Sequence, residues 1–216
     1  MTRAYVAEFL GTAMLLVSVV GSGIMAETLS PDNIGVALLA NAIATGAMLW
    51  VIISVLGPIS GAHFNPAVTL YFALRRETAP QVALAYVPLQ VAGALAGVWL
   101  AHAMFDQPLL QLSSTAHRTG GAQWLSEGLA TLGLLFVIAG ALAHRAEAVA
   151  ALVALYITGA YWFTASTSFA NPAVTIARSF TDTFAGILPA HAPAFILAQI
   201  VAVGIAAVTL PRLFPR

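Results

Sequence analysis

The sequence predicts an all-α membrane protein in which six transmembrane helices and two half-length helices form an inverted repeat. Composition is the first reason, because 60% of the 216 residues are hydrophobic and only 7% are charged, whereas roughly a quarter are charged in soluble domains. The second reason is that six apolar segments approach the length of about 20 residues that crosses a bilayer as a helix. The third is the pentapeptide NPAVT, which occurs twice, each time opening an apolar run too short to cross.

The six apolar segments are separated by short stretches rich in turn-forming or charged residues, such as ETLSPDN and HRAE. The first segment begins almost at the N-terminus. Its length and its lack of a small-residue cleavage pattern favour a retained helix over a signal peptide. The six expected spans are residues 4–26, 34–57, 81–104, 122–143, 147–166 and 192–213.

Two further apolar runs, 65–74 and 171–180, are half as long as a span, because ten residues of helix reach about 15 Å. Each run begins with Asn-Pro-Ala. Asn is a favoured N-cap, and Pro is favoured at the first helical position, where its missing N–H would be unpaired anyway. Each NPA is therefore expected to start a short helix.

The order of landmarks repeats along the chain. AEFLGTAMLL resembles SEGLATLGLL, which aligns Glu8 with Glu127. PLQVAGALAG resembles LAQIVAVGIA, which aligns Gln90 with Gln199. Each copy holds three spans, so the second lies upside down relative to the first, an arrangement whose site usually lies at the midplane between the halves. The single domain, residues 1–216, thus divides into repeat one, 1–105, and repeat two, 122–216.

In an inverted pair the two short helices enter from opposite faces and meet with their N-termini at the bilayer centre. Each N-terminus carries roughly half a positive charge, and the amides of Asn65 and Asn171 are expected to present N–H donors there. A neutral hydroxyl oxygen is accepted at such a place, whereas a cation or a proton-carrying water chain is repelled. Two copies of the motif are needed because each supplies half of one barrier.

Charge and residue usage limit the remaining possibilities. Six spans that start in the cytoplasm place six of the eight arginines inside and leave only Arg118 and Arg178 outside. The positive-inside rule then predicts a multi-pass protein of the cell (inner) membrane with both termini cytoplasmic. There is no cysteine, the five histidines lack metal-ligand spacing, and the net charge is zero. We therefore expect no metal, no cofactor and no nucleic acid partner.

The stretch SGAHFNPAVTL, residues 60–70, is close to the first signature of the major intrinsic protein family, and the chain resembles these aquaporins and aquaglyceroporins over nearly its whole length. The resemblance implies an aquaporin-like fold, one pore per subunit and usually a homotetramer. It also implies the NPA pore centre, namely Asn65, Pro66, Ala67, Asn171, Pro172 and Ala173. Pore-lining backbone carbonyls are expected at Gly61, Ala62, His63, Thr167, Ser168 and Phe169.

The glutamates of the repeat lie inside apolar spans, where a charged group is usually buried and paired. We expect Glu8 and Glu127 to be structural, each carboxylate accepting backbone N–H groups of the non-helical stretch that leads into a half-helix. The resemblance gives them, with Gln90 and Gln199, the same buried role. A proton relay is the functional alternative for the glutamates. His63 is likewise interpreted as a satisfied vestibule histidine, with a pH gate as the alternative.

The second motif departs from the family at Val174, where members usually carry Arg. That Arg belongs to a narrow four-residue filter, and spacing from the two asparagines assigns the other positions to Thr45, Gly159 and Ser168. This set is small, uncharged and free of aromatics, so it opens the constriction and removes a fixed charge. We predict a passive channel, not an enzyme, for water and uncharged solutes such as glycerol, urea and neutral metalloid acids, including methylated arsenicals.

Two other functions stay open. Tyr161, Trp162 and Phe163 are close enough in sequence to refill the gap, which would give a narrow, water-selective aquaporin. A coupled secondary transporter also uses inverted repeats and broken helices, but it needs acidic residues near its site, and only the two repeat-matched glutamates are available. An intramembrane hydrolase has no support, because the sequence has no G-x-S-x-G stretch and no clear Ser–His pairing.

Arg178 has two interpretations. Asn171, Val174 and Arg178 are spaced as i, i+3 and i+7, so they share one helical stripe. If the first two face the pore, Arg178 lies about 6 Å further along the helix, at a pore mouth, as a displaced barrier to cations. The alternative is an interfacial Arg that snorkels to lipid headgroups.

Overall fold

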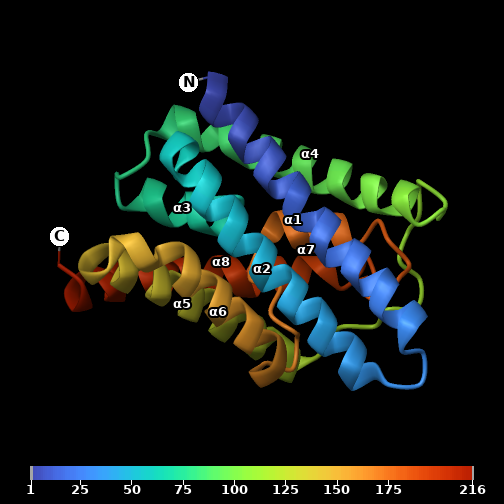
Figure 1. Ribbon diagram of the computed structural model, residues 1–216. Helices are drawn as coiled ribbons and strands as arrows, with labels where there is room; N and C mark the ends of the chain where they lie inside the picture. Colours follow the sequence, from blue (N-terminus) through green and yellow to red (C-terminus); the bar gives the residue numbers. More distant parts are fainter. Residues whose placement is uncertain (1, 216) are drawn as a thin grey trace.

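The computed structural model describes residues 2–215, and in this part of the chain the regular elements are helices (Figure 1). Both termini lie at the same end of the bundle, here called the terminal end (Figure 1). The helices are α1 (Thr2–Leu29), α2 (Ile34–Ser60), α3 (Pro66–Leu74), α4 (Pro80–Met104), α5 (Gly121–His144), the 3-10 turn η1 (Ala146–Ala148), α6 (Val149–Phe163), α7 (Pro172–Arg178) and α8 (Ala192–Leu213).

Within the described residues, six helices are long and apolar enough to cross a membrane, which confirms the six predicted spans. The helices begin and end within three residues of the predicted bounds, and the differences at the fifth span and the second short helix have a clear cause. The fifth span is an α-helix only over α6, because the turn η1 precedes it and the chain leaves the helix at Thr164. The second short helix ends at Arg178, where the N–H groups of Ser179 and Phe180 donate to carbonyls three residues back and tighten the last turn.

The two halves of the chain form matching sets of helices. Helix α1 packs against α2 and α4, as α5 packs against α6 and α8. Between the halves, α2 packs against α6, and each short helix contacts a long helix of the other half, α3 with α8 and α7 with α4. Helix α3 leads from the centre toward the terminal end and α7 leads away from it (Figure 1). Both halves therefore enclose the start of the two short helices.

The short helices begin at the asparagines of the NPA motifs. Asn65 and Asn171 have extended backbones, and a proline follows each at the first helical position. Oδ1 of Asn65 accepts the N–H of Ala67 at 2.8 Å. Oδ1 of Asn171 accepts the N–H groups of Ala173 at 2.9 Å and Val174 at 3.3 Å. Each side chain thus satisfies backbone donors that the first turn leaves unpaired.

Glycines allow α1 and α4 to approach closely. A methyl group on Gly93 would overlap the carbonyl oxygen of Phe9, and one on Gly97 would overlap that of Ala13. In both cases the obstacle is backbone, which cannot rotate away as a side-chain tip can. Gly204 of α8 is different, because a methyl group there would meet no atom within 4 Å.

Gly93→Ala is therefore expected to destabilise the protein by about 1–3 kcal/mol, because the added carbon forces α1 and α4 apart. Thermal unfolding in detergent micelles measures the effect. Gly204→Ala is the control and should leave the melting temperature unchanged or raise it, because Ala is the better helix former by up to about 1 kcal/mol. Equal melting temperatures for the two variants would contradict the close approach.

Candidate functional site

The two NPA motifs meet in the centre of the bundle. Nδ2 of Asn65 donates to the carbonyl oxygen of Ala170 at 2.8 Å, and Nδ2 of Asn171 donates to that of Phe64 at 2.8 Å. Each motif therefore holds the backbone that directly precedes the other. An amide nitrogen carries two hydrogens, so one N–H of each asparagine remains for a molecule in the adjoining cavity.

The residues before the two motifs share an unusual backbone conformation. Left-handed φ values recur at matching positions, and outside glycine this conformation costs roughly 1–3 kcal/mol for each residue. A backbone bent in this way leaves N–H and C=O groups that no helix satisfies, so they need partners from side chains. The left-handed residues are Gly61, Ala62 and Phe64 in the first stretch and Thr167, Ser168 and Ala170 in the second.

A buried carboxylate supplies the partner in the first half. Glu8 of α1 is 0% exposed and accepts the backbone N–H groups of His63 at 3.0 Å and Phe64 at 2.7 Å. It also accepts from Nε2 of Gln90 at 2.7 Å, and the same nitrogen donates to the hydroxyl of Thr69 at 2.9 Å. The carboxylate thereby ties α1, the bent stretch, α3 and α4 together.

The second half repeats this network. Glu127 of α5 is 0% exposed and accepts the N–H groups of Phe169 at 2.8 Å and Ala170 at 2.9 Å. Nε2 of Gln199 donates to Glu127 at 2.7 Å and to the hydroxyl of Thr175 at 2.9 Å. The four repeat-matched polar residues are thus placed where the sequence predicts buried structural partners.

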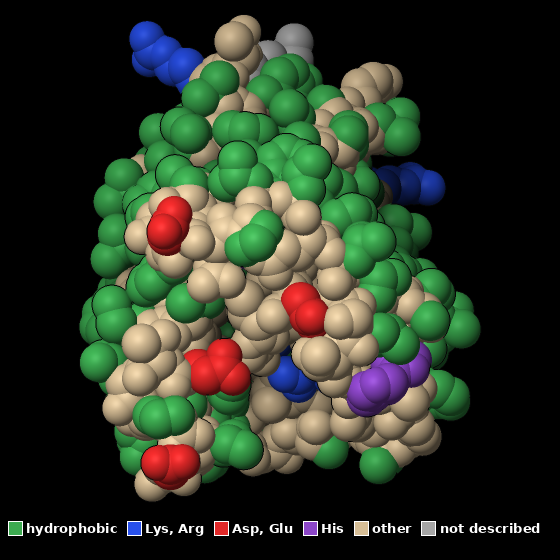
Figure 2. Space-filling view, turned by 90° about the vertical axis from the view of Figure 1, so that its right-hand side faces the viewer, with side chains coloured by type: hydrophobic (Ala, Val, Ile, Leu, Met, Phe, Trp, Pro, Cys, Tyr) green, Lys and Arg blue, Asp and Glu red, His purple; other side chains and the backbone are tan. Residues whose placement is uncertain are grey.

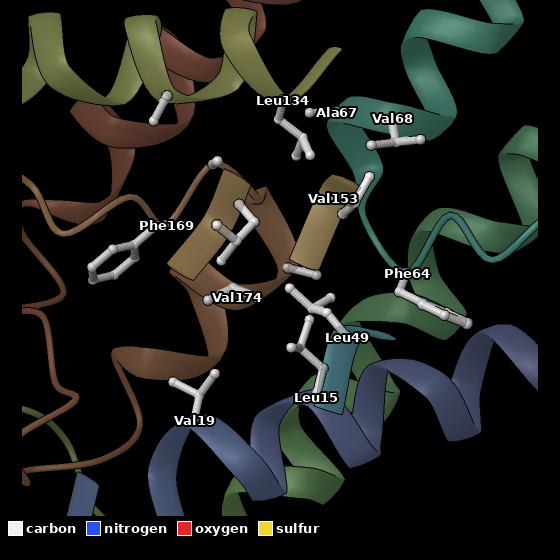
Figure 3. Close-up of a cluster of buried hydrophobic side chains, with 14 of the residues drawn as sticks. Leu15, Val19, Leu49, Phe64, Ala67, Val68, Leu134, Val153, Phe169 and Val174 are labelled. Carbon is white, nitrogen blue, oxygen red and sulfur yellow. The ribbon is translucent and has the colours of Figure 1, made fainter. Parts of the chain in front are cut away.

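A cavity of about 130 Å³ passes the two motifs. Figure 3 shows its apolar neighbours, with side chains of several helices converging and the rings of Phe64 and Phe169 on opposite sides in this view. Of the predicted pore residues, those that line the cavity are Thr45, Gly61, Ala62, His63, Asn65, Ser168, Phe169, Asn171, Val174 and Arg178. Those outside the lining are Pro66, Ala67, Gly159, Thr167, Pro172 and Ala173.

His63 is held on several sides at the edge of this cavity. Its ring stacks on Phe72 with the ring centres 5.0 Å apart and meets Tyr86 edge-on at 5.5 Å. Nδ1 lies 3.0 Å from the hydroxyl oxygen of Thr69, which also binds Gln90. This placement fits a satisfied histidine in the wall of the cavity.

The predicted filter position on α6 needs a correction, because Tyr161 lines the cavity and Gly159 does not. The side chains of α6 that line it recur every four residues, so they form one stripe of the helix. Gly159 is two residues from Tyr161, which turns it away from that stripe. Tyr161 is 3% exposed, and its hydroxyl lies 3.2 Å from that of Thr45. The stripe consists of Val149, Val153, Ile157 and Tyr161.

Arg178 lies inside the protein and does not extend to the surface. Its side chain is 2% exposed and lines the cavity. Its Nε donates to the carbonyl oxygen of Ala185, and its Cζ lies 3.5 Å from the centre of the Phe169 ring. The charge is thus held beside the cavity, on the side away from the terminal end.

Arg118 is a residue that the sequence analysis did not select. It lies on the connection between α4 and α5, and its guanidinium donates to the carbonyl oxygens of Gly186 at 2.9 Å, Phe184 at 3.5 Å and Ser166 at 3.5 Å. Its Cζ lies 5.4 Å from the centre of the same Phe169 ring. The only sequence signal was that Arg118 shares the sparsely basic face with Arg178.

The family model of the major intrinsic proteins matches residues 1–165. The chain belongs to the major intrinsic protein family. It is 58% identical over 200 residues to the aquaglyceroporin AqpS of Rhizobium meliloti (strain 1021), which covers 93% of this chain and 85% of that protein. It is 36% identical over 129 residues to the probable aquaporin PIP2-8 of Arabidopsis thaliana, across 60% of this chain and 44% of the plant protein.

A solved structure has the same fold. The X-ray structure of the aquaglyceroporin from Plasmodium falciparum matches with a TM-score of 0.67 at 20% identity, over 99% of this chain and 95% of that chain. At this identity the likeness concerns the fold alone. It confirms the helical architecture that the sequence predicts, and the family model and the relative from Rhizobium meliloti confirm the family.

Glu127→Gln is expected to destabilise the folded protein by about 2 kcal/mol or more, because the new amide turns a donor toward backbone N–H groups that need an acceptor. Unfolding followed by tryptophan fluorescence in detergent measures this loss. Glu27→Gln, at an exposed carboxylate on α1, is the control and should unfold like the unaltered protein. Equal stability of the two variants would refute the proposed role of the carboxylate.

Proposed function

We propose that this protein is a passive channel for water and small uncharged solutes such as glycerol, urea and neutral metalloid acids, including methylated arsenicals. The reciprocal bonds of Asn65 and Asn171 carry the proposal, because they fix two amide donors side by side in the wall of a cavity. A hydroxylated solute exchanges its bonds to water for bonds to these donors. The high identity to a protein named aquaglyceroporin supports the same solute class.

Large apolar side chains form most of the wall of the cavity toward the terminal end, beside the bent stretch at residues 61–63. A neutral solute gives up little hydration free energy there. An ion finds too few polar groups to replace its hydration shell, so its desolvation cost is large. Passage is therefore restricted to molecules without charge. The apolar lining includes Leu49, Ile53, Ile138, Leu142 and Val153.

We assign the selectivity filter to Thr45, Tyr161, Ser168 and Val174, which line the cavity from four different segments. The hydroxyls of Thr45 and Tyr161 form one polar edge, and the hydroxyl of Ser168 has no hydrogen-bond partner within residues 2–215. Val174 provides an apolar edge. A wall with hydroxyls on one side and hydrocarbon on the other matches a polyol, whose carbon chain and hydroxyl groups also lie on different sides.

We further propose that the terminal end faces the cytoplasm of the cell (inner) membrane and that four copies assemble. The positive-inside rule supports the orientation, because Arg3, Arg75, Arg76, Arg145 and Arg212 belong to that end. Large apolar side chains on the outside of the bundle, among them Leu84 at 77% and Leu125 at 74% exposed, suit contact with lipid or with further copies. The homotetramer follows from the family resemblance.

Stopped-flow light scattering on proteoliposomes, with water, glycerol and urea gradients, tests the proposal. We expect all three solutes to equilibrate faster than in empty vesicles. Flux of water alone would favour the water-selective alternative, in which the Tyr161 side chain narrows the passage. Accumulation of solute above its external concentration in an ion gradient would instead identify a coupled transporter.

Val174→Arg is expected to reduce glycerol and urea flux at least about tenfold while water flux falls less, because the long charged side chain narrows the passage. The same stopped-flow assay measures both rates. Val174→Met separates bulk from charge, since it adds length without a guanidinium. Unchanged glycerol flux in Val174→Arg would show that Val174 is not part of the filter.

Arg178→Ala is expected to weaken the exclusion of cations, because it removes a buried positive charge beside the cavity. Proton and sodium leak into proteoliposomes, followed with a pH-sensitive dye and with ion flux under an imposed potential, should rise several-fold. Arg145→Ala, at an exposed arginine of the terminal end, is the control. An unchanged leak would reject Arg178 as a displaced barrier.

A further inference from the structure

Two arginines lie near the same aromatic ring, one lining an open pocket and the other lining the buried cavity. Arg118 lines a polar pocket of about 420 Å³ on the face away from the termini, and Arg178 lines the inner cavity. Figure 2 shows this face, with a basic side chain in a hollow and acidic and histidine side chains around it. The two Cζ atoms lie 5.4 and 3.5 Å from the centre of the Phe169 ring. Both charges therefore lie within about one Debye length, roughly 8–10 Å, of each other.

Neither arginine forms an ion pair with a carboxylate in residues 2–215. The buried carboxylate of Glu127 accepts from Phe169, Ala170 and Gln199 instead. Two positive charges therefore remain without a direct counter-charge.

Asp182, which lines the open pocket, does not neutralise them either. Ser114 and Thr115 donate four hydrogen bonds to its carboxylate, at 2.7 to 3.0 Å. The hydroxyl and backbone N–H of Ser114, with those of Thr115, hold the pKa of this carboxyl well below its usual range. Asp182 is thus an ionised group that fastens the connection between α4 and α5 and does not pair with an arginine.

Arg118 and Arg178 differ in the hydrogen-bond donors that they have free for a ligand. Carbonyl oxygens and the hydroxyl of Thr167 already bind the nitrogens of Arg118, which therefore contributes charge. In Arg178 only Nε has a protein acceptor, and the two terminal nitrogens donate to nothing within residues 2–215 although the side chain is 2% exposed. Arg178 and Ser168 both line the cavity, and the hydroxyl of Ser168 is also without a partner in the described residues.

We propose that Arg118 and Arg178 form a binding site for a small monovalent oxyanion on this side of the cavity. The free guanidinium fork of Arg178 fits two oxygens of such an anion, and the charge of Arg118 strengthens its hold. The inference rests on the proposed channel function, because the anion is held in the solute path. The apolar wall beyond prevents an ion from crossing, so the anion blocks the channel reversibly.

Methanesulfonate and dimethyl sulfone are matched probes, since both are small tetrahedral molecules and only the first is an anion. Glycerol flux into proteoliposomes is measured with each probe at equal concentration on both sides and at constant ionic strength, so orientation does not matter. We expect methanesulfonate to reduce the flux in a saturable way and dimethyl sulfone to leave it nearly unchanged. Equal inhibition by both probes would overturn the proposal.

Arg118→Gln should raise the half-inhibiting concentration of methanesulfonate roughly tenfold or more, because a charge at the site is lost. Arg178→Lys keeps the charge but loses the fork, and it should weaken inhibition to a smaller degree. Arg145→Gln, which removes an exposed charge at the terminal end, is the control. Methanesulfonate should inhibit this variant at the same concentration as the unaltered protein. The same inhibition constant in Arg118→Gln and Arg145→Gln would also overturn the proposal.

Calorimetric titration of the purified protein with methanesulfonate separates this site from the channel function, because it requires no transport. We expect one anion per chain, with binding weakened in Arg118→Gln. Binding in the absence of glycerol flux would leave the anion site standing while the channel proposal fails. Glycerol flux without any binding of methanesulfonate would refute the anion site alone.

Discussion

Irregular backbone at the centre of a membrane bundle must have its polar groups satisfied by protein, because lipid offers no hydrogen bonds. The site depends on this constraint. Glu8 and Glu127 each accept two consecutive backbone N–H groups in front of an NPA motif. These acceptors stabilise left-handed conformations that would otherwise be unfavourable, and the bent stretches in turn set the position of the half-helices. A buried carboxylate thus helps determine where the asparagine amides point.

The two halves complete each other at one place. Asn65 binds the carbonyl group before the second motif, and Asn171 binds the one before the first. Within residues 2–215 the amide nitrogen of each asparagine donates only to the other half, so the pair of donors is held in place only when both halves are docked. The packing of α3 on α8 and of α7 on α4 also joins the two halves, because each short helix contacts a long helix of the other half. An inverted repeat of this kind is therefore one cooperative unit with one site.

Local, repeated signals were predictable from the sequence. Asn-Pro starts a helix wherever it lies, and Glu and Gln at matching places in two copies predict matching networks. The filter position on α6 was not predictable by counting from Asn171, because the bent stretch between them fixes which face of the helix turns inward. As a result Tyr161, and not Gly159, reaches the cavity. Arg118 depends even more on folding, since the connection between α4 and α5 must lie over residues 184–186 to bring it near Phe169.

The proposed filter separates the width of the passage from its charge. An arginine at position 174, as the family usually has, would supply both a narrow passage and a positive charge at one point. Steric exclusion acts only at contact, whereas electrostatic repulsion extends over about 8–10 Å at moderate salt and further inside a low-dielectric wall. A small side chain at Val174 can therefore leave room for a larger solute while Arg178, one turn further along the helix, and Arg118 on a neighbouring connection still act on ions. The buried setting of Arg178 strengthens this effect, because bulk water screens it poorly.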